Sequence, residues 1–216
     1  MRKLLLPIIA MLAFAGHVNT ANAQDAKAGE KKAAMCIGCH GIPGYQASFP
    51  EVHKVPMIAG QGAKYIASAL SAYKKGDRKH PTMRAIAGSL SDQDMADLAA
   101  FYSTEAKPAT LADKPDHEPS ADVAALLKKA NCVSCHGENF SKPIDPTYPK
   151  LAGQHADYLY VALKAYQTQN NPQVGRANPI MGGMSTMYSH AELKLLAQYI
   201  GSLNGELQTV QQSRFK

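Results

Sequence analysis

The stretch Cys36-Ile37-Gly38-Cys39-His40 decides the fold of this chain, and a second copy follows at Cys132-Val133-Ser134-Cys135-His136. Together the two copies use every cysteine among the 216 residues. Cys-x-x-Cys-His is the pattern that attaches c-type haem: each thiol adds across one vinyl group of the porphyrin, and the histidine ligates the iron. We therefore predict two covalent haems, with thioether bonds from Cys36, Cys39, Cys132 and Cys135 and with His40 and His136 as axial iron ligands.

Cys-x-x-Cys without a histidine also occurs in redox-active dithiols and in zinc sites. A dithiol does not require the histidine that follows both pairs here. A zinc site built from all four cysteines would leave both histidines without a role. Two complete copies of the motif therefore favour haem over either alternative.

The first residues have the features of a secretory signal peptide. Arg2 and Lys3 precede an apolar run at 4–15, and Ala21-Asn22-Ala23 is a small-x-small cleavage site. The run is shorter than the roughly 20 residues that span a bilayer, which argues against an uncleaved anchor, and no later stretch is apolar enough to cross one. We expect cleavage near Ala23, after residues 1–23, and a mature protein in the periplasm, where bacteria attach c-type haem.

The composition is mildly basic, with 23 Lys and Arg against 17 Asp and Glu and a net charge of +6. The propionates of two haems would offset most of this charge. The chain has no lysine-rich stripe with interleaved aromatic residues, so we do not expect nucleic-acid binding. Tryptophan is absent and aromatic residues make up 7%, so the haems must supply much of each core.

The region after the signal peptide is an internal duplication. Pro-x-x-Ala-Gly-Gln occurs at 56–61 and at 149–154, followed each time by an amphipathic helical pattern with two tyrosines. A proline-rich, charged linker at 105–119 separates the copies. The sequence therefore predicts an all-α fold of two tandem domains, 24–104 and 120–216, each enclosing one covalent haem.

Each copy is expected to begin and end with a helix. Asp25 caps the first helix of the N-terminal copy, predicted over 26–35, and Ser120 or Asp122 caps its counterpart. Ser91 and Ser189 begin the last helices, each with an acid at the third helical position. The apolar stripes of these last helices predict the following buried residues: Met95, Leu98, Ala99, Tyr102, Leu193, Leu196, Ala197 and Ile200.

Met83 and Met181 are the candidates for the second axial ligand of each iron. They occupy matching places in the repeat, in His80-Pro-Thr-Met and Asn178-Pro-Ile-Met, and both segments are predicted to be loops. A methionine thioether raises the potential relative to a second histidine and leaves no open iron position, so it favours an electron carrier over an enzyme.

The other methionines and histidines are expected to have structural roles. Met184 and Met187 align with Ile86 and Ser89 in the repeat, Met57 is opposite Lys150, and Met35 and Met95 are expected to fill the core. Ligation by two histidines would need a histidine at equivalent places in both copies. None of the five others after the signal peptide has such a partner, so we expect them at the surface or in hydrogen bonds: His53, His80, His117, His155 and His190.

Three further features allow two interpretations each. The carbonyls of Pro56 and Pro149 either accept a hydrogen bond from Nδ1 of the motif histidine or belong to simple turns before a helix. Tyr73 and Tyr166 either pack in the core, which we favour, or reach a propionate. The basic cluster either docks an acidic partner or, as we favour, complements a helix C-terminus; it consists of Lys74, Lys75, Arg78 and Lys79.

The duplicated motifs, the paired Pro-x-Met segments and the stretch Leu-Ser-Asp-Gln-Asp-Met-Ala-Asp-Leu-Ala at 90–99 resemble the dihaem cytochrome c4 family. The second copy departs from that stretch at Tyr188-Ser-His-Ala-Glu but keeps its capping pattern. The resemblance covers the whole mature chain and implies two cytochrome c-like domains with their haems close together. It also implies a periplasmic carrier, sometimes membrane-associated, between quinol-side complexes and a terminal oxidase or other reductase.

Two other functions remain as alternatives. The chain is similar in fold to the electron-accepting cytochrome subunit of larger dehydrogenases, such as flavocytochrome c sulfide dehydrogenase, and would then copurify with its flavoprotein. A dihaem peroxidase is less favoured, because it needs an open or displaceable iron ligand and both copies carry a matched methionine.

Overall fold

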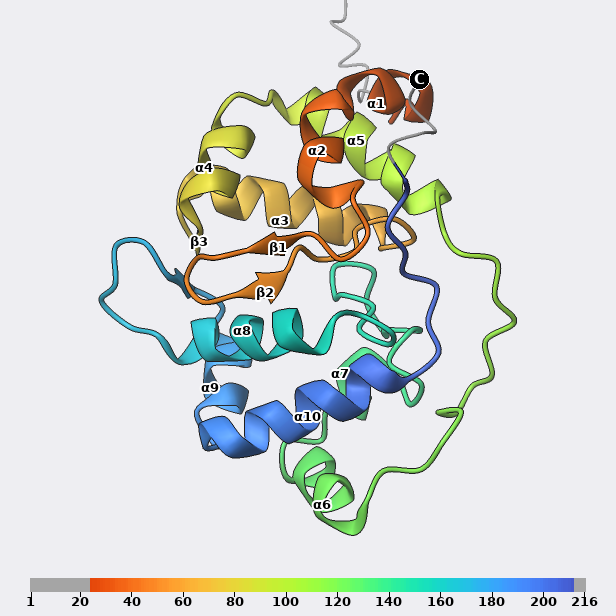
Figure 1. The fold of residues 1–216 in the computed structure, drawn as a ribbon, viewed down its shortest axis with the longest axis vertical. Helices are drawn as coiled ribbons and strands as arrows, with labels where there is room; N and C mark the ends of the chain where they lie inside the picture. The colour runs from red at the N-terminus through yellow and green to blue at the C-terminus, as the bar shows by residue number, and fades with distance from the viewer. Residues whose placement is uncertain (1–23, 212–216) are drawn as a thin grey trace, which may run out of the picture.

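The computed structural model describes residues 24–211, so the predicted signal peptide at 1–23 lies outside the described residues. It shows two helical domains, one above the other in Figure 1, which confirms the all-α fold class. The N-terminal domain contains α1 (Ala26–Lys32), α2 (Ala34–His40), α3 (Ala63–Lys75), α4 (Pro81–Gly88) and α5 (Asp92–Thr104). The C-terminal domain contains α6 (Ala121–Lys129), α7 (Val133–His136), α8 (Ala156–Gln167), α9 (Pro179–Ser185) and α10 (His190–Ser202). Across residues 24–211, no helix has the length and apolar character needed to cross a bilayer.

The structure also contains two small antiparallel sheets that the sequence did not predict. β1 (Gln46–Ala47) pairs with β2 (His53–Lys54) within the N-terminal domain. β3 (Arg78–Lys79) pairs with β4 (Gly175–Arg176) and thereby joins the two domains. Strands of two residues are too short to show the alternation of apolar and polar residues by which strands are predicted.

The helix starts follow the predicted caps. The Asp25 side chain accepts hydrogen bonds from the backbone at the start of α1, and Ser120, rather than Asp122, caps α6. Complete capping boxes begin α5 at Ser91 and α10 at Ser189. The helix predicted over 26–35 is interrupted, since α1 ends at Lys32 and α2 begins after Ala33.

The cores lie where the repeat predicts them. All the residues expected to be inward in α5 and α10 are buried. In the N-terminal domain they pack with Ile66 of α3, and Leu159 of α8 packs similarly in the C-terminal domain. The same stripe of each repeat therefore builds the same helix-on-helix core.

The segment after α10 returns to the N-terminal domain, along the side of the molecule that also carries the linker (Figure 1). Val210 is buried in the N-terminal core. The Gln208 N–H donates to the Ala59 carbonyl at 3.1 Å, and the Lys107 N–H donates to the Glu206 carbonyl at 2.9 Å. The two domains are thus connected both by the linker and by this returning segment.

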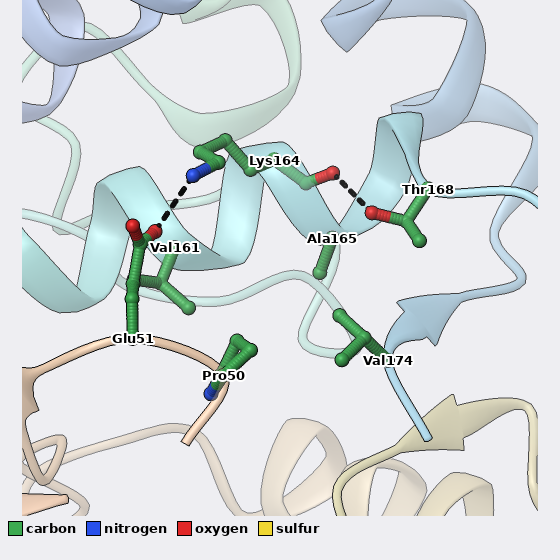
Figure 2. Close-up of a pocket in the computed structure, with 7 residues that line it drawn as sticks. All are labelled: Pro50, Glu51, Val161, Lys164, Ala165, Thr168 and Val174. Atoms are coloured by element: carbon green, nitrogen blue, oxygen red, sulfur yellow. Dashed lines mark hydrogen bonds and ion pairs between the residues drawn. The ribbon is translucent and has the colours of Figure 1, made fainter. Parts of the chain in front are cut away.

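A small cavity lies between the domains, where the loop at 50–51 faces α8 (Figure 2). Glu51 and Lys164 form an ion pair of 2.9 Å across it, and the Thr168 hydroxyl donates to the Lys164 carbonyl at 3.1 Å. Its volume of about 120 Å³ is below the roughly 300 Å³ at which small-molecule sites begin. This cavity is therefore not a candidate ligand site.

A buried carboxylate fixes the contact between α1 and α5. Asp97 is 2% exposed and accepts hydrogen bonds from Lys32 Nζ at 2.7 Å, the Asp25 N–H at 3.0 Å and Gln93 Nε2 at 2.6 Å. The hydrogen bond from Lys32 is the main cause that holds the pKa of Asp97 below its usual value. Gly29 allows this close approach, because a Cβ there would lie 2.0 Å from the Asp97 carbonyl oxygen.

Replacing Asp97 with asparagine is expected to lower the free energy of unfolding by about 2 kcal/mol at pH 7, the scale of a charge-assisted hydrogen bond. Because folding lowers the pKa of Asp97, its contribution is complete above about pH 4 and is lost as the pH falls through the folded value. Denaturant unfolding of both holoproteins from pH 7 to pH 3 should show the two curves converge. Asp92→Asn, an exposed carboxylate on the same helix, is the control, and equal stability of Asp97→Asn and wild type at pH 7 would contradict the account.

Candidate functional site

The two Cys-x-x-Cys-His motifs lie on short helices in separate domains. Cys36, Cys39 and His40 share one face of α2, as residues three and four apart do on a helix. Cys132 immediately precedes α7, which carries Cys135 and His136. The first cysteine of each motif packs against its own domain's core, and none of the four is in a disulfide. Within the described residues the four cysteines therefore do not form one shared zinc site.

Both motif histidines make the predicted hydrogen bond to a proline carbonyl. His40 Nδ1 lies 2.8 Å from the Pro56 oxygen, and His136 Nδ1 lies 3.2 Å from the Pro149 oxygen. A carbonyl can only accept, so Nδ1 carries the proton and Nε2 is left unprotonated and available to bind a metal. This confirms the carbonyl interpretation over simple turns.

The protonation state of both rings also suits a ligand. Burial lowers the pKa of His40 and of His136 below the usual value, and the hydrogen bonds to Pro56 and Pro149 oppose this only in part. Both imidazoles are therefore neutral at pH 7. A neutral imidazole is the form that binds a metal.

Met83 and Met181 occupy equivalent places, but the prediction that they lie in loops is wrong. Each is in the first turn of a short helix, α4 or α9, because proline at the first helical position and a capping side chain start a helix there. His80 Nδ1 accepts from the Met83 N–H at 3.4 Å, and Asn178 Oδ1 accepts from the Met181 N–H at 2.9 Å. The unlike residues His80 and Asn178 thus share one role, as N-caps, and each fixes the backbone of a candidate ligand.

Of Met35 and Met95, which were expected to fill the core, only Met95 does. Met95 is buried, whereas Met35 is 48% exposed, so the prediction that Met35 fills the core is wrong. The interruption at Ala33 breaks the single apolar stripe on which that prediction depended. Met184 and Met187 are both exposed beside Met181.

Several of the other histidines have hydrogen-bond partners, as expected. His53 is buried and its Nδ1 lies 2.8 Å from the Glu51 oxygen. His117 Nε2 lies 3.0 Å from the Ser202 hydroxyl. His155 is half-buried at the start of α8, and His190 is exposed at the start of α10.

Two arginines meet at the boundary between the domains, where β3 pairs with β4. Arg78 is opposite Arg176 in this sheet. Arg78 Nη2 donates to the Tyr158 hydroxyl at 2.6 Å, Arg78 Nη1 donates to the Tyr65 hydroxyl at 3.2 Å, and Arg176 Nη2 donates to the Tyr158 hydroxyl at 3.1 Å. The Arg78 guanidinium also lies 4.6 Å from the centre of the Tyr73 ring, and the Arg176 guanidinium lies 5.3 Å from that of Tyr166.

Tyr73 and Tyr166 are therefore half-buried beside arginines instead of packing in the apolar cores, and the core-packing prediction for them is wrong. The i to i+8 spacing that placed them on the apolar stripe puts them at its far end, where the domains meet. Sequence periodicity alone does not distinguish that boundary from the core.

The arginine pair lacks a negative partner in the part of the chain that the structure describes. The ion pairs found across 24–211 involve neither Arg78 nor Arg176, and Arg78 Nε is buried without a hydrogen-bond partner. Burial raises the pKa of Tyr158, but the two guanidinium groups outweigh it and lower that pKa to about 8. Half-buried cations without a carboxylate fit a bound group that brings its own negative charge, as the propionates of haem do.

The predicted basic cluster does not form one surface. Lys74 and Lys75 lie in the last turn of α3, where they complement the helix dipole as predicted. Arg78 and Lys79 instead cross to the other domain, and Lys79 Nζ donates to the Asn171 carbonyl at 2.7 Å. The strand β3 separates the four residues into a helix end and a domain contact.

The repeated geometry defines the class of protein, a c-type cytochrome built from two similar helical domains. The cytochrome c family matches residues 26–104 and 120–204, one match in each domain. Cytochrome c4 from Azotobacter vinelandii is 30% identical over 217 residues, which cover 94% of this chain and all of that protein. The chain therefore belongs to the dihaem cytochrome c4 family, binds one covalent c-type haem in each domain and transfers electrons.

Two further similarities bear on function. The crystal structure of reduced recombinant cytochrome c4 from Pseudomonas stutzeri superposes with a TM-score of 0.60 at 27% identity, covering 84% of this chain and 100% of that one. A protein named thiosulfate dehydrogenase electron acceptor, from Stutzerimonas stutzeri (strain A1501), is 32% identical over 85% of both chains. The same two-domain architecture is therefore found in a protein named for accepting electrons from a dehydrogenase.

Proposed function

We propose that the chain is a two-haem electron carrier in which both irons have histidine and methionine as axial ligands. His40 and Met83 serve the haem attached to Cys36 and Cys39, and an equivalent set serves the second haem: Cys132, Cys135, His136 and Met181. The observation that carries the proposal is the duplicated histidine geometry, with each Nδ1 held by a proline carbonyl and each Nε2 left to ligate. When bound, haem supplies one-electron exchange between ferric and ferrous iron.

The protein's axial side chains favour electron transfer by the haems over catalysis on a bound substrate. With haem bound, a thioether from Met83 or Met181 would complete the iron's ligands, so peroxide and oxygen would have no site to bind. Capping by His80 and Asn178 fixes the backbone of both methionines. A fixed ligand set keeps the rearrangement that accompanies each electron small.

We propose that the arginine pair at the domain boundary, Arg78 and Arg176, binds haem propionates. Arg78→Leu is expected to lower the haem potentials by on the order of tens of millivolts, because a unit charge in a partly buried setting at about 10 Å is worth between about 1 and 2 kcal/mol. Potentiometric titration of the holoprotein measures this shift. Lys31→Leu, which removes an exposed charge, is the control, and an equal shift in both variants would contradict the assignment.

We place the mature protein in the periplasm, where it carries electrons between respiratory complexes, from a quinol-side donor to a terminal oxidase or other reductase. Covalent haem attachment and the signal-peptide features of residues 1–23 support this location. Peripheral association with the membrane surface is compatible with the same role.

A second candidate is the electron acceptor of a dehydrogenase, favoured by the similarity to the thiosulfate dehydrogenase electron acceptor. Purification of the chain from its own cells separates the two candidates. A carrier is isolated alone and, once reduced, is oxidised rapidly by membranes that contain the terminal oxidase. A dehydrogenase partner copurifies instead and reduces the chain when its substrate, thiosulfate or sulfide, is added. Turnover of hydrogen peroxide by the purified chain would overturn both candidates in favour of a peroxidase.

A further inference from the structure

The glutamine that ends each Pro-x-x-Ala-Gly-Gln segment reaches into the other domain. Gln61 Oε1 accepts from the Lys150 N–H at 2.8 Å, and Gln61 Nε2 donates to the Lys150 carbonyl at 2.9 Å. Gln154 does the same with Met57, at 3.0 and 2.8 Å. Both side chains are buried, at 5% and 4% exposure. One amide on each side therefore pairs with both backbone groups of one residue in the opposite domain.

The backbone holds both glutamines in the same way. Gly60 and Gly153 have φ values of +83° and +74°, which glycine adopts without strain. The Gly60 N–H donates to the Tyr102 carbonyl at the end of one core helix, and the Gly153 N–H donates to that of Ile200 at the equivalent place. Each Oε1 also accepts from the N–H of the residue that follows its own glutamine. The orientation of each amide is therefore set partly by contacts within its own domain.

The groups that the glutamines hold are the peptide units bound by the motif histidines. The Pro56–Met57 peptide accepts from His40 through its carbonyl and donates to Gln154 through its N–H. The Pro149–Lys150 peptide links His136 and Gln61 in the same manner. Each histidine thus belongs to a hydrogen-bond chain that ends on a glutamine of the opposite domain.

We propose that the glutamines are crossed positioning residues: Gln154 tunes the N-terminal haem through His40, and Gln61 tunes the C-terminal haem through His136. Hydrogen bonds in a chain polarise one another. Donation from a peptide N–H to a glutamine makes the peptide oxygen a stronger acceptor and the imidazole a stronger donor to iron. A stronger donor stabilises ferric iron, so each glutamine lowers the potential of the haem in the opposite domain. The proposal rests on the histidine ligation given under Proposed function.

The test uses Gln154→Met and Gln61→Met in the holoprotein, with the potential of each haem followed separately through its haem methyl signals in NMR. Met83→His and Met181→His assign the signals, because each lowers the potential of one haem. Gln154→Met is expected to raise the potential of the N-terminal haem more than that of the C-terminal haem. Gln61→Met is expected to do the reverse.

Two further variants separate polarisation from a general weakening of the domain contact. Gln154→Glu keeps the size of the side chain, loses the donor to the Met57 carbonyl and offers the Met57 N–H a stronger acceptor. The N-terminal haem potential should therefore fall selectively, opposite in sign to Gln154→Met. Gln208→Met removes another glutamine that donates to a backbone carbonyl outside its own domain, that of Glu105 at 2.7 Å, and should cause no selective shift. If Gln154→Met does not fold, the selective fall in the N-terminal haem potential of Gln154→Glu still tests the proposal.

Equal shifts of both haems, a larger shift of the haem in the substituted domain, or no shift would overturn the crossed assignment. An open iron position, which the proposed ligation excludes, is seen separately, because the unsubstituted reduced protein would then bind carbon monoxide. Selective and reciprocal shifts in a protein that excludes carbon monoxide would support both.

Discussion

Replacing Met181 with alanine is expected to let carbon monoxide bind to half of the reduced haem, whereas the unsubstituted protein binds none. The thioether is the only protein ligand that we assign to the distal side of the C-terminal haem. Its loss should also remove that haem's sulfur-to-iron charge-transfer band and lower its potential by roughly a few tenths of a volt, within the range that axial ligands control. Optical spectra with and without carbon monoxide, normalised to haem per chain, measure the effect.

The matched control is Met184→Ala, three residues further along α9. Met184 is 39% exposed and aligns with Ile86 in the repeat, so its replacement should leave both haems closed to carbon monoxide. Met83→Ala should reproduce the Met181 result in the N-terminal domain. Carbon monoxide binding in Met184→Ala, and not in Met181→Ala, would move the ligand assignment to Met184.

Replacing both Cys36 and Cys39 with alanine is expected to leave one covalent haem per chain and to abolish cooperative unfolding of the N-terminal domain. Cys36 packs against the N-terminal core, which has no tryptophan and belongs to a domain near the lower size limit for independent folding. The C-terminal haem should remain, because Cys132 packs on a separate core. Denaturing gels stained for haem and calorimetry of the purified variant measure both effects.

Met35→Ala controls for substitution next to the motif. Its side chain is 48% exposed, so this variant should keep two covalent haems and both unfolding transitions. Two covalent haems in the double cysteine variant would contradict the attachment sites. One haem with an intact N-terminal transition would mean that the apolar cluster is sufficient for that domain to fold.

The features that were predictable from the sequence are those encoded within one helix or one repeat. Ser91 and Ser189 begin helices because capping needs only a side chain and an acid three residues later. Leu98 and Leu196 are buried because both lie on apolar stripes of helical period. The hydrogen bond from His40 to Pro56 was foreseen as one of two interpretations, from the place of the proline in the repeat.

The features that were missed depend on contacts between the copies. Arg78 was counted with Lys74 in a basic cluster, and only its pairing with Arg176 shows that it belongs to the domain boundary. Apart from the repeat, in which Gln154 occupies the equivalent position, nothing in the sequence marks Gln61 as important. Its hydrogen-bond partner, Lys150, lies in the other half of the chain. His80 and Asn178 looked unlike as ligands, although both offer an acceptor at the same position, which could have identified them as equivalent caps.

The central claim is that both irons are six-coordinate through His40, Met83, His136 and Met181. The most direct test is titration of the dithionite-reduced, unsubstituted protein with carbon monoxide, followed optically and normalised to haem per chain. The account predicts two haems per chain and no spectral change up to saturating gas. A change in half of the haem would show one open or labile iron, remove one methionine from its assignment and favour an enzyme over a carrier.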